Sequence, residues 1–330
     1  MTLPLYALLT TATLAGAPAT WDGFQSEHSL SCLTTDALEP PETLEHAGFT
    51  YVFHGTSVQV RRDSKRAHAD IRLGVLSGIK ELDDTTKAQL TGWLAKFKAA
   101  DVDAILVGGD NAEDESRLDD VFQFLAATEL PTYVIIGNWE GRASFNRALR
   151  DAAKGHPNLI NGDFARRFDG EGFDVITLPG YNDKQFVRSS GGCIYIPDDA
   201  KSIVTLAKQS DDPVVLLMHG PPRMKGKDAI DFVPDSGNVG DENVAAAIAE
   251  AKIQLGIHGH ILEAGQRATD INGKPVPQNK MVKSLFVNPG PANALPWKLN
   301  DGKTSYGAAA LVTMQDGKAK WELWAAPKPK

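Results

Sequence analysis

From about residue 71 onward, the chain alternates short apolar runs with helical patterns. Apolar runs of strand length predict buried strands over 71–77, 102–109, 131–137, 173–180, 213–220 and 253–259. Apolar residues at helical spacing predict helices over 84–99, 117–128, about 143–153, 198–208 and 242–251. Further β-rich runs follow at 284–290, 310–314 and 321–326. Strands that alternate with helices indicate an α/β fold with helices on both faces of the sheet.

The first 20 residues differ from the rest because they carry no charged side chain. Their apolar stretch is shorter than the roughly 20 residues that a membrane-spanning helix needs, so we expect no transmembrane span. It ends in small residues that fit an A-x-A cleavage pattern. We therefore expect residues 1–20 to be a secretory signal peptide and the protein to be periplasmic or secreted. Because Lys and Arg are missing here, a buried N-terminal helix or strand in a cytoplasmic protein is the alternative.

An N-terminal extension over residues 21–70 precedes the main domain. Residues 21–49 are rich in turn-forming residues and show no clear period, so we expect an extended lead-in. Two short β-rich runs over 50–62 surround His54 and Gly55, which predicts a β-hairpin. The remainder, residues 71–330, is expected to form one large α/β domain.

Composition narrows the class of protein. With 42% hydrophobic and 23% charged residues, the 330-residue chain is typical of soluble globular proteins and is neither fibrous nor wholly disordered. Its formal net charge of -8 argues against binding to nucleic acid or to an anionic membrane surface. The two cysteines, Cys32 and Cys193, are too few for a disulfide scaffold. They could pair if the chain is exported, and the sequence leaves that pairing open.

Polar residues follow several of the predicted strands at their carboxyl ends, where α/β folds bind ligands. These strand-end segments are Gly78–Lys80, Gly109–Asp110, Gly137–Glu140, His219–Gly220 and His258–His260. A converging set of Asp, Asn and His side chains suits a divalent metal from the middle of the first transition row.

The same segments resemble the sequence blocks of the calcineurin-like metallophosphoesterases. That family has D-x-H, G-D, G-N-H-[ED], a single H and G-H-x-H in this order. The matching segments here are Gly109-Asp110, Gly137-Asn138-Trp139-Glu140, His219 and Gly259-His260. The resemblance covers roughly residues 71–315. It implies a sandwich of two mixed β-sheets flanked by helices, and phosphoester hydrolysis assisted by divalent metal ions.

The chain departs from the family pattern at four positions. These are Gly78 and Lys80 in place of D-x-H, Trp139 in G-N-H, and Leu262 at the end of G-H-x-H. An alternative alignment pairs His258 with His260 as ligands, but it still leaves Leu262 in the final position.

Three of these departures, at Gly78, Lys80 and Leu262, fall on one of the two metal sites that the family implies. The first site uses the D-x-H pair, the G-D aspartate and the last histidine of G-H-x-H, and only Asp110 of this set remains. The second site is complete, with Asp110, Asn138, His219 and His260. The resemblance therefore implies one divalent ion, Mn, Fe or Zn, or no ion at all if the site has fallen out of use.

The substituted residues leave open alternatives. Lys80 could restore a positive charge beside Asp110 in place of the missing ion, or it could point to solvent. Trp139 cannot transfer protons, and the loss of general acid–base help costs about 10²–10⁴-fold in rate; its ring could stack on a ligand or only fill space. Arg142 and Arg223 could bind a phosphate or be ordinary surface residues.

Three functions are compatible with this pattern. We expect a family member whose phosphoester hydrolysis is lost or strongly weakened and whose site binds a phosphorylated small molecule or protein partner. The alternative is a slow single-metal phosphoesterase with a specialised substrate. A purely structural role for the remaining His and Asn residues is the third, and the complete second site argues against it.

Overall fold

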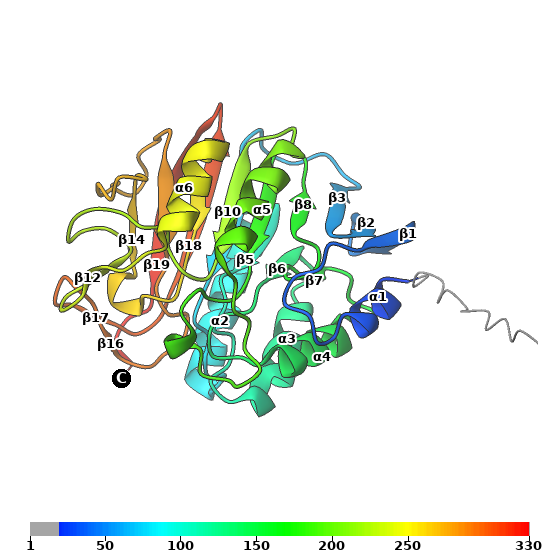
Figure 1. Cartoon of the computed structure of the whole chain (residues 1–330), viewed down its shortest axis with the longest axis horizontal. Helices are drawn as coiled ribbons and strands as arrows, with labels where there is room; N and C mark the ends of the chain where they lie inside the picture. The colour runs from blue at the N-terminus through cyan, green and yellow to red at the C-terminus, as the bar shows by residue number, and fades with distance from the viewer. Residues whose placement is uncertain (1–19, 330) are drawn as a thin grey trace, which may run out of the picture.

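The computed structural model describes residues 20–329, in which two β-sheets pack face to face and helices flank them (Figure 1). The smaller sheet contains, in order, β19 (Lys318–Ala325), β18 (Ala308–Gln315), β4 (Ile71–Leu76), β5 (Ala104–Val107), β6 (Thr132–Val134) and β7 (Leu159–Asn161). The neighbours from β4 to β7 run parallel, whereas β18 pairs antiparallel with β4 and β19. This is the mixed sheet that the family resemblance implies.

The larger sheet has nine strands. In order they are β1 (Ala37–His46), β2 (Phe49–Gly55), β3 (Ser57–Arg62), β8 (Arg167–Asp169), β9 (Asp174–Leu178), β10 (Val214–Met218), β13 (Leu255–Ile257), β15 (Leu285–Asn288) and β14 (Arg267–Thr269). Its centre, β9 to β15 across the sheet, is parallel. Two small antiparallel pairs complete the strands: β11 (Phe232–Val233) with β12 (Gly237–Asn238), and β16 (Trp297–Lys298) with β17 (Thr304–Ser305).

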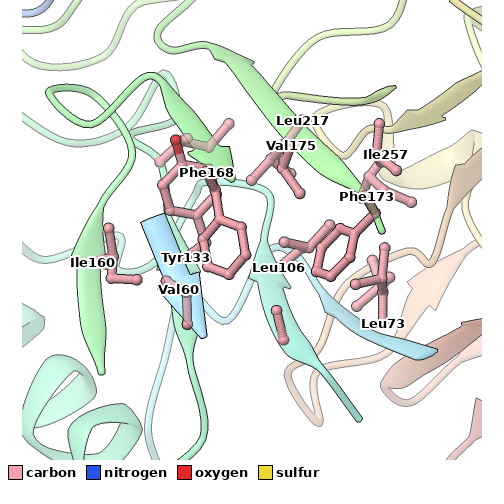
Figure 2. Close-up of a cluster of buried hydrophobic side chains, with 14 of the residues drawn as sticks. Val60, Leu73, Leu106, Tyr133, Ile160, Phe168, Phe173, Val175, Leu217 and Ile257 are labelled. Atoms are coloured by element: carbon pink, nitrogen blue, oxygen red, sulfur yellow. The ribbon is translucent and has the colours of Figure 1, made fainter. Parts of the chain in front are cut away.

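Alternating side chains of the strands build separate cores on the two faces of each sheet. Leu73 and Leu106 of the smaller sheet meet Val175 and Leu217 of the larger one between the sheets (Figure 2). On the outer faces, the smaller sheet packs against α2 (Asp84–Ala99), α3 (Leu118–Ala126) and α4 (Arg142–Ala153). The larger sheet packs against α5 (Pro197–Lys208) and α6 (Glu242–Ala251). Three short 3-10 turns are η1 (Glu115–Arg117), η2 (Lys184–Phe186) and η3 (Leu262–Ala264).

The predicted helices and strands of residues 71–326 are confirmed, but most of the strands are shorter than predicted. The run 102–109, for example, yields only Ala104–Val107 as β5. The glycines and polar residues that end such runs belong to the following loops, where they are available to form a site.

The lead-in predicted for residues 21–49 is wrong, because this segment contains α1 (Trp21–Glu27) and β1. Stacking of Trp21 on Phe53, with ring centroids 4.6 Å apart, buries the short helix. The two prolines at 40 and 41 lie in β1, an edge strand, where a missing N–H is tolerated. The predicted hairpin is confirmed as β2 and β3. Since β3 also pairs with β8, the extension completes the larger sheet.

A disulfide joins Cys32 to Cys193, whose Cα atoms lie 5.4 Å apart. It links the N-terminal extension to a loop that follows β9. Within residues 20–329 no helix is long and apolar enough to cross a membrane. The predicted signal peptide falls almost entirely on residues 1–19, which lie outside the described residues.

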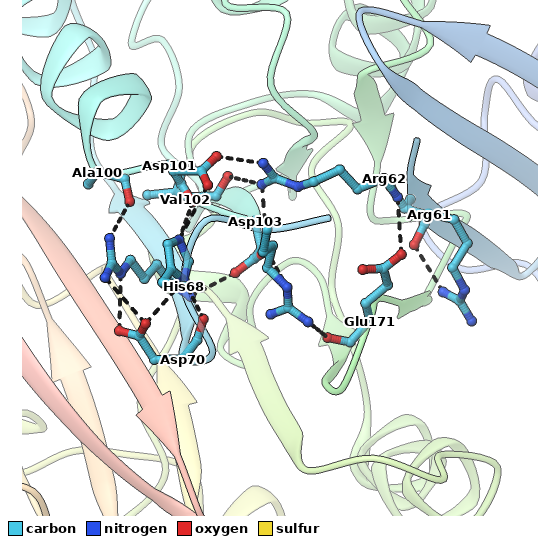
Figure 3. A network of polar contacts seen from close by, with 12 residues as sticks. Arg61, Arg62, His68, Asp70, Ala100, Asp101, Val102, Asp103 and Glu171 are labelled. Carbon is cyan, nitrogen blue, oxygen red and sulfur yellow. Dashed lines mark hydrogen bonds and ion pairs between the residues drawn. The ribbon is translucent and has the colours of Figure 1, made fainter. Parts of the chain in front are cut away.

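A charged network closes the amino ends of β4 and β5 (Figure 3). Arg62 pairs with Asp101 and Asp103, and the two ring nitrogens of His68 face Asp70 and Asp101. Because the strand-end segments singled out in the sequence lie at the carboxyl ends of the same strands, this network supports the fold and not the candidate site.

Candidate metal and ligand site

Loops from both sheets converge at the carboxyl ends of their parallel strands. Asp110 follows β5 and Asn138 follows β6 in the smaller sheet, while His219 follows β10 and His260 follows β13 in the larger one. Parallel strands place such loops along one edge of a sheet, and the face-to-face packing brings the two edges together.

The side chains of these four loops meet. His219 Nε2 lies 2.8 Å from Asn138 Oδ1 and 3.2 Å from Asp110 Oδ1. His260 Nδ1 lies 2.9 Å from the same amide oxygen and 3.2 Å from His219 Nε2. The structure therefore brings together all four residues that the sequence predicts as the second metal site, here called the four-residue cluster.

Backbone geometry makes this close approach feasible. Gly109 has a φ of +84°, and a Cβ at this position would lie 2.7 Å from His219 Nδ1, so only glycine fits. Lys80, Asp110 and His260 all have φ values of 53–55°, in the left-handed region that residues other than glycine seldom adopt. Unusual backbone of this kind gathers at functional sites.

Hydrogen bonds orient the donor atoms toward a common centre. Asn138 Nδ2 donates to the Phe186 carbonyl at 2.6 Å, which turns Oδ1 toward the histidines. His219 Nδ1 donates to the Gly108 carbonyl at 2.8 Å, so a neutral His219 presents its Nε2 lone pair to the cluster. A carboxylate oxygen, an amide oxygen and imidazole lone pairs repel one another unless a cation lies among them.

The separations fit a divalent ion. Metal–ligand distances of about 2.1 Å in an octahedral shell place neighbouring donor atoms about 3 Å apart, and the measured separations are 2.8–3.2 Å. No three His, Cys, Asp or Glu side chains within residues 20–329 form a metal-binding group by themselves. A site here therefore depends on the amide oxygen of Asn138.

The cluster attracts positive charge. Burial raises the pKa of Asp110, but His219 and the Lys80 ammonium outweigh it and hold this pKa at about 2. Burial lowers the pKa of His219, yet Asp110 raises it overall. Burial and the charge on His219 hold the pKa of His260 at about 3. A proton on His219 or a divalent ion can supply the charge.

Glu140 joins the loops that carry two of the candidate ligands. This buried carboxylate accepts hydrogen bonds from the backbone N–H of Gly137, at 2.9 Å, and of Asn111. Burial and the nearby charge of Asp110 raise the pKa of Glu140 to about 7. Its part is to hold the loops of Asp110 and Asn138 together.

The positions that align with the family's first metal site carry glycine, lysine and leucine here. A Cβ on Gly78 would lie 3.4 Å from Leu262 Cδ2, so two of these positions are in contact. The Lys80 ammonium lies 2.8 Å from Glu113 Oε1 and 4.4 Å from the ring centroid of Trp139. Since Lys80 is only 5% exposed, the alternative in which it points to solvent is wrong.

The cluster opens into a cavity of about 830 Å³. The sequence-predicted residues that line it are Lys80, Asp110, Asn138, Trp139, Arg223 and His260. A loop over residues 181–192 forms one wall: Tyr181 lies against His260 with ring centroids 4.0 Å apart, and the Arg188 guanidinium carbon lies 5.7 Å from the Trp139 ring centroid. The sequence does not predict this loop as part of the site because the loop carries no ligand motif. Cys193, which follows the loop, is the one residue near it that the sequence singles out.

The other candidate residues have different surroundings. Arg223 lines the cavity, but its Nε donates to the Gly240 carbonyl at 2.8 Å and Nη1 lies 3.7 Å from Glu242. Arg142 begins α4 and has Nη1 3.9 Å from Cys32 Sγ. The structure does not bring Arg142 to the cavity.

His258 lies outside the cluster. Its Nδ1 is 3.1 Å from the Gly220 carbonyl, and its ring stacks on Phe286 with centroids 5.9 Å apart. Burial lowers the pKa of His258 to about 3. A neutral core histidine accounts for these contacts, and the alternative alignment that makes His258 a ligand has no support from them.

Comparisons with known proteins agree with this architecture. Among solved structures, TT1561 of Thermus thermophilus is similar with a TM-score of 0.51 and 14% identity, over 77% of this chain and 99% of that one. The purple acid phosphatase PPD1 from yellow lupin, Lupinus luteus, has a TM-score of 0.51 and 10% identity, over 84% of this chain and 57% of that one. At these identities the likeness shows the fold alone.

Sequence comparison assigns the family. The sequence has no significant match among curated proteins. It matches the profile described as Calcineurin-like phosphoesterase over residues 74–264, more than half of its length. The chain therefore belongs to the calcineurin-like phosphoesterase family.

Proposed function

We propose that the protein is an exported phosphoesterase-family member that holds one divalent metal ion and binds a phosphorylated small molecule or protein partner. Asp110, Asn138, His219 and His260 would hold the ion. A bound ion would supply a Lewis acid that polarises a phosphoryl oxygen. Hydrolysis of the bound phosphoester is lost or strongly weakened.

One contrast supports this proposal: the four-residue cluster has all its ligands, whereas the positions of the family's first metal site have other residues. The four-residue cluster has its donor atoms 2.8–3.2 Å apart. At the former first site, Leu262 packs beside Gly78 and the Lys80 ammonium supplies a fixed positive charge. An ammonium cannot be a ligand for a second metal, so the in-line clamp of a two-metal site cannot form.

The chain also lacks a proton-transferring side chain that hydrolases of this family have. Trp139 stands where the family has a histidine, and an indole cannot transfer protons at neutral pH. Losing general acid–base help costs about 10²–10⁴-fold in rate. A cavity of about 830 Å³ beside the cluster still leaves room for a ligand, which favours binding over a purely structural role.

Export is supported by the disulfide between Cys32 and Cys193. Structural disulfides persist in the periplasm and outside the cell, and they are rare in the cytosol. A periplasmic or secreted location is thus proposed over a cytoplasmic one.

A slow single-metal phosphoesterase with a specialised substrate is the second candidate, favoured by the completeness of the four-residue cluster. The two are separated by turnover of p-nitrophenyl phosphate and bis(p-nitrophenyl) phosphate on Mn²⁺-loaded protein, beside an Asp110→Ala, His219→Ala control. We expect no turnover above the control. Slow turnover that vanishes in the control would favour the second candidate, and ordinary enzyme rates that vanish there would overturn both.

A further inference from the structure

The loop over residues 181–192 is bound tightly to the four-residue cluster. The Arg188 backbone N–H donates to the Asn138 carbonyl at 2.8 Å, and the Asn138 side chain donates to the Phe186 carbonyl at 2.6 Å. Further along the loop, Gly191 accepts a hydrogen bond from the Arg142 N–H, and the Cys193 disulfide follows. The loop therefore has a fixed position beside a candidate metal ligand.

Arg188 differs from the other cations of the cavity because its guanidinium is free. Within residues 20–329 it has no hydrogen-bond or ion-pair partner, although it lies 5.7 Å from the Trp139 ring centroid. Lys80 is paired with Glu113, and Arg223 is engaged by the Gly240 carbonyl and Glu242.

The acid on the same loop is already occupied. Asp183 accepts hydrogen bonds from the backbone N–H of Gln185 at 3.0 Å and from its side-chain amide at 2.6 Å. The five N–H donors of Arg188 thus remain available to an anion in the cavity.

We propose that Arg188 binds the non-bridging oxygens of a phosphate monoester in this cavity, with the phosphate lying between the guanidinium and the four-residue cluster. This inference rests on the proposed function and names a residue outside the family's sequence blocks. A planar guanidinium forms paired hydrogen bonds to phosphate and keeps its charge at every physiological pH. Arg188 would favour an anionic ligand and hold it next to Asp110 and Asn138.

The test is calorimetric titration of inorganic phosphate into the full-length protein, both metal-free and loaded with Mn²⁺. Arg188→Gln removes the charge, and Arg188→Lys keeps the charge but removes the planar fork. Lys184→Gln is the matched control, because it removes one cation from the same loop at a residue that does not line the cavity. Thermal unfolding of each variant shows that it is folded.

We expect Arg188→Gln to weaken phosphate binding by about tenfold to a hundredfold, the range for loss of a charge-assisted hydrogen bond. Arg188→Lys should give a smaller loss and Lys184→Gln less than about threefold. Equal losses in Arg188→Gln and Lys184→Gln would overturn the inference, as would unchanged binding in Arg188→Gln or no phosphate binding by the wild type in either form. Titration of Mn²⁺ without phosphate tests the metal site separately, so failure of the two proposals can be distinguished.

Discussion

The Lys80 ammonium lies 4.4 Å from the ring centroid of Trp139, and both residues stand where the family has histidines. The two side chains contact each other: the indole gives the cation an aromatic face, and Glu113 pairs with the cation at 2.8 Å. Since Leu262 packs beside Gly78, the four altered positions form two mutually supporting pairs. The positions that align with these family residues are therefore part of the packed structure.

Replacing Lys80 with Met should destabilise the fold. The side chain is buried, and the change removes both its ion pair with Glu113 and its cation–π contact with Trp139. We expect a loss of about 1–3 kcal/mol in the free energy of unfolding, measured by urea denaturation. The exposed Lys184→Met is the control and should change stability by less than about 0.5 kcal/mol. If both variants change the unfolding free energy by the same small amount, the contacts of Lys80 with Glu113 and Trp139 do not stabilise the fold.

Restoring the family's ligands should rebuild a second metal site. The change is Gly78→Asp, Lys80→His, Trp139→His and Leu262→His together. Asp tolerates the left-handed backbone at position 78, where a Cβ meets Leu262 and Pro291 at ordinary contact distances. We expect bound Mn²⁺ to rise from one ion per chain to two, measured by elemental analysis.

The matched control for this variant adds Asp110→Ala, which removes the ligand shared by both sites. Metal binding should then be lost at both. No gain of metal in the restored variant, provided that it folds, would undermine the alignment of these positions.

Breaking the disulfide should loosen the loop that holds Asn138 in orientation. Cys32→Ser with Cys193→Ser frees the end of this loop, and we expect both weaker Mn²⁺ binding and a loss of about 2–4 kcal/mol in unfolding free energy. Calorimetric titration and urea denaturation measure the two effects. A dithiol reductant should reproduce them in the wild type and change nothing further in the double variant. If Mn²⁺ affinity is unaltered in the double variant and in the reduced wild type, the disulfide does not support the metal site.

Asp174 should make stability depend on pH. Burial raises the pKa of this carboxyl from 3.8 to about 6, so the folded state keeps a proton that the unfolded chain has released. The unfolding free energy should therefore fall as the pH rises from about 4 to 6, by about 1–3 kcal/mol, since one pKa unit corresponds to about 1.4 kcal/mol. Asp174→Asn should flatten this slope in urea denaturation at pH 4, 5, 6 and 7. An unchanged slope would exclude Asp174 as its source.

The sequence predicts the main domain well because its strands are continuous apolar runs bounded by glycine. Asp110, Asn138, His219 and His260 each follow such a strand, and the family resemblance singles out these four as one ligand set. The strands and the residues that follow them depend on local sequence, and they can therefore be predicted without the structure.

What the sequence does not predict depends on long-range packing. Helix α1 is stabilised by the stacking of Trp21 on Phe53 and not by helical periodicity.

Arg188 and Tyr181 reach the cavity because an irregular loop folds back onto Asn138. The pairing of Lys80 with Glu113 joins residues from two different loops, and either residue by itself reads as an ordinary surface charge.

The number of tightly bound metal ions per chain tests the central claim most directly. Purified protein, equilibrated with Mn²⁺, Fe²⁺ or Zn²⁺ and freed of excess ion, is analysed for metal beside Asp110→Ala. The account predicts about one ion per chain for the wild type and none for the variant. Two tightly bound ions per chain, or one ion that survives Asp110→Ala, would contradict it.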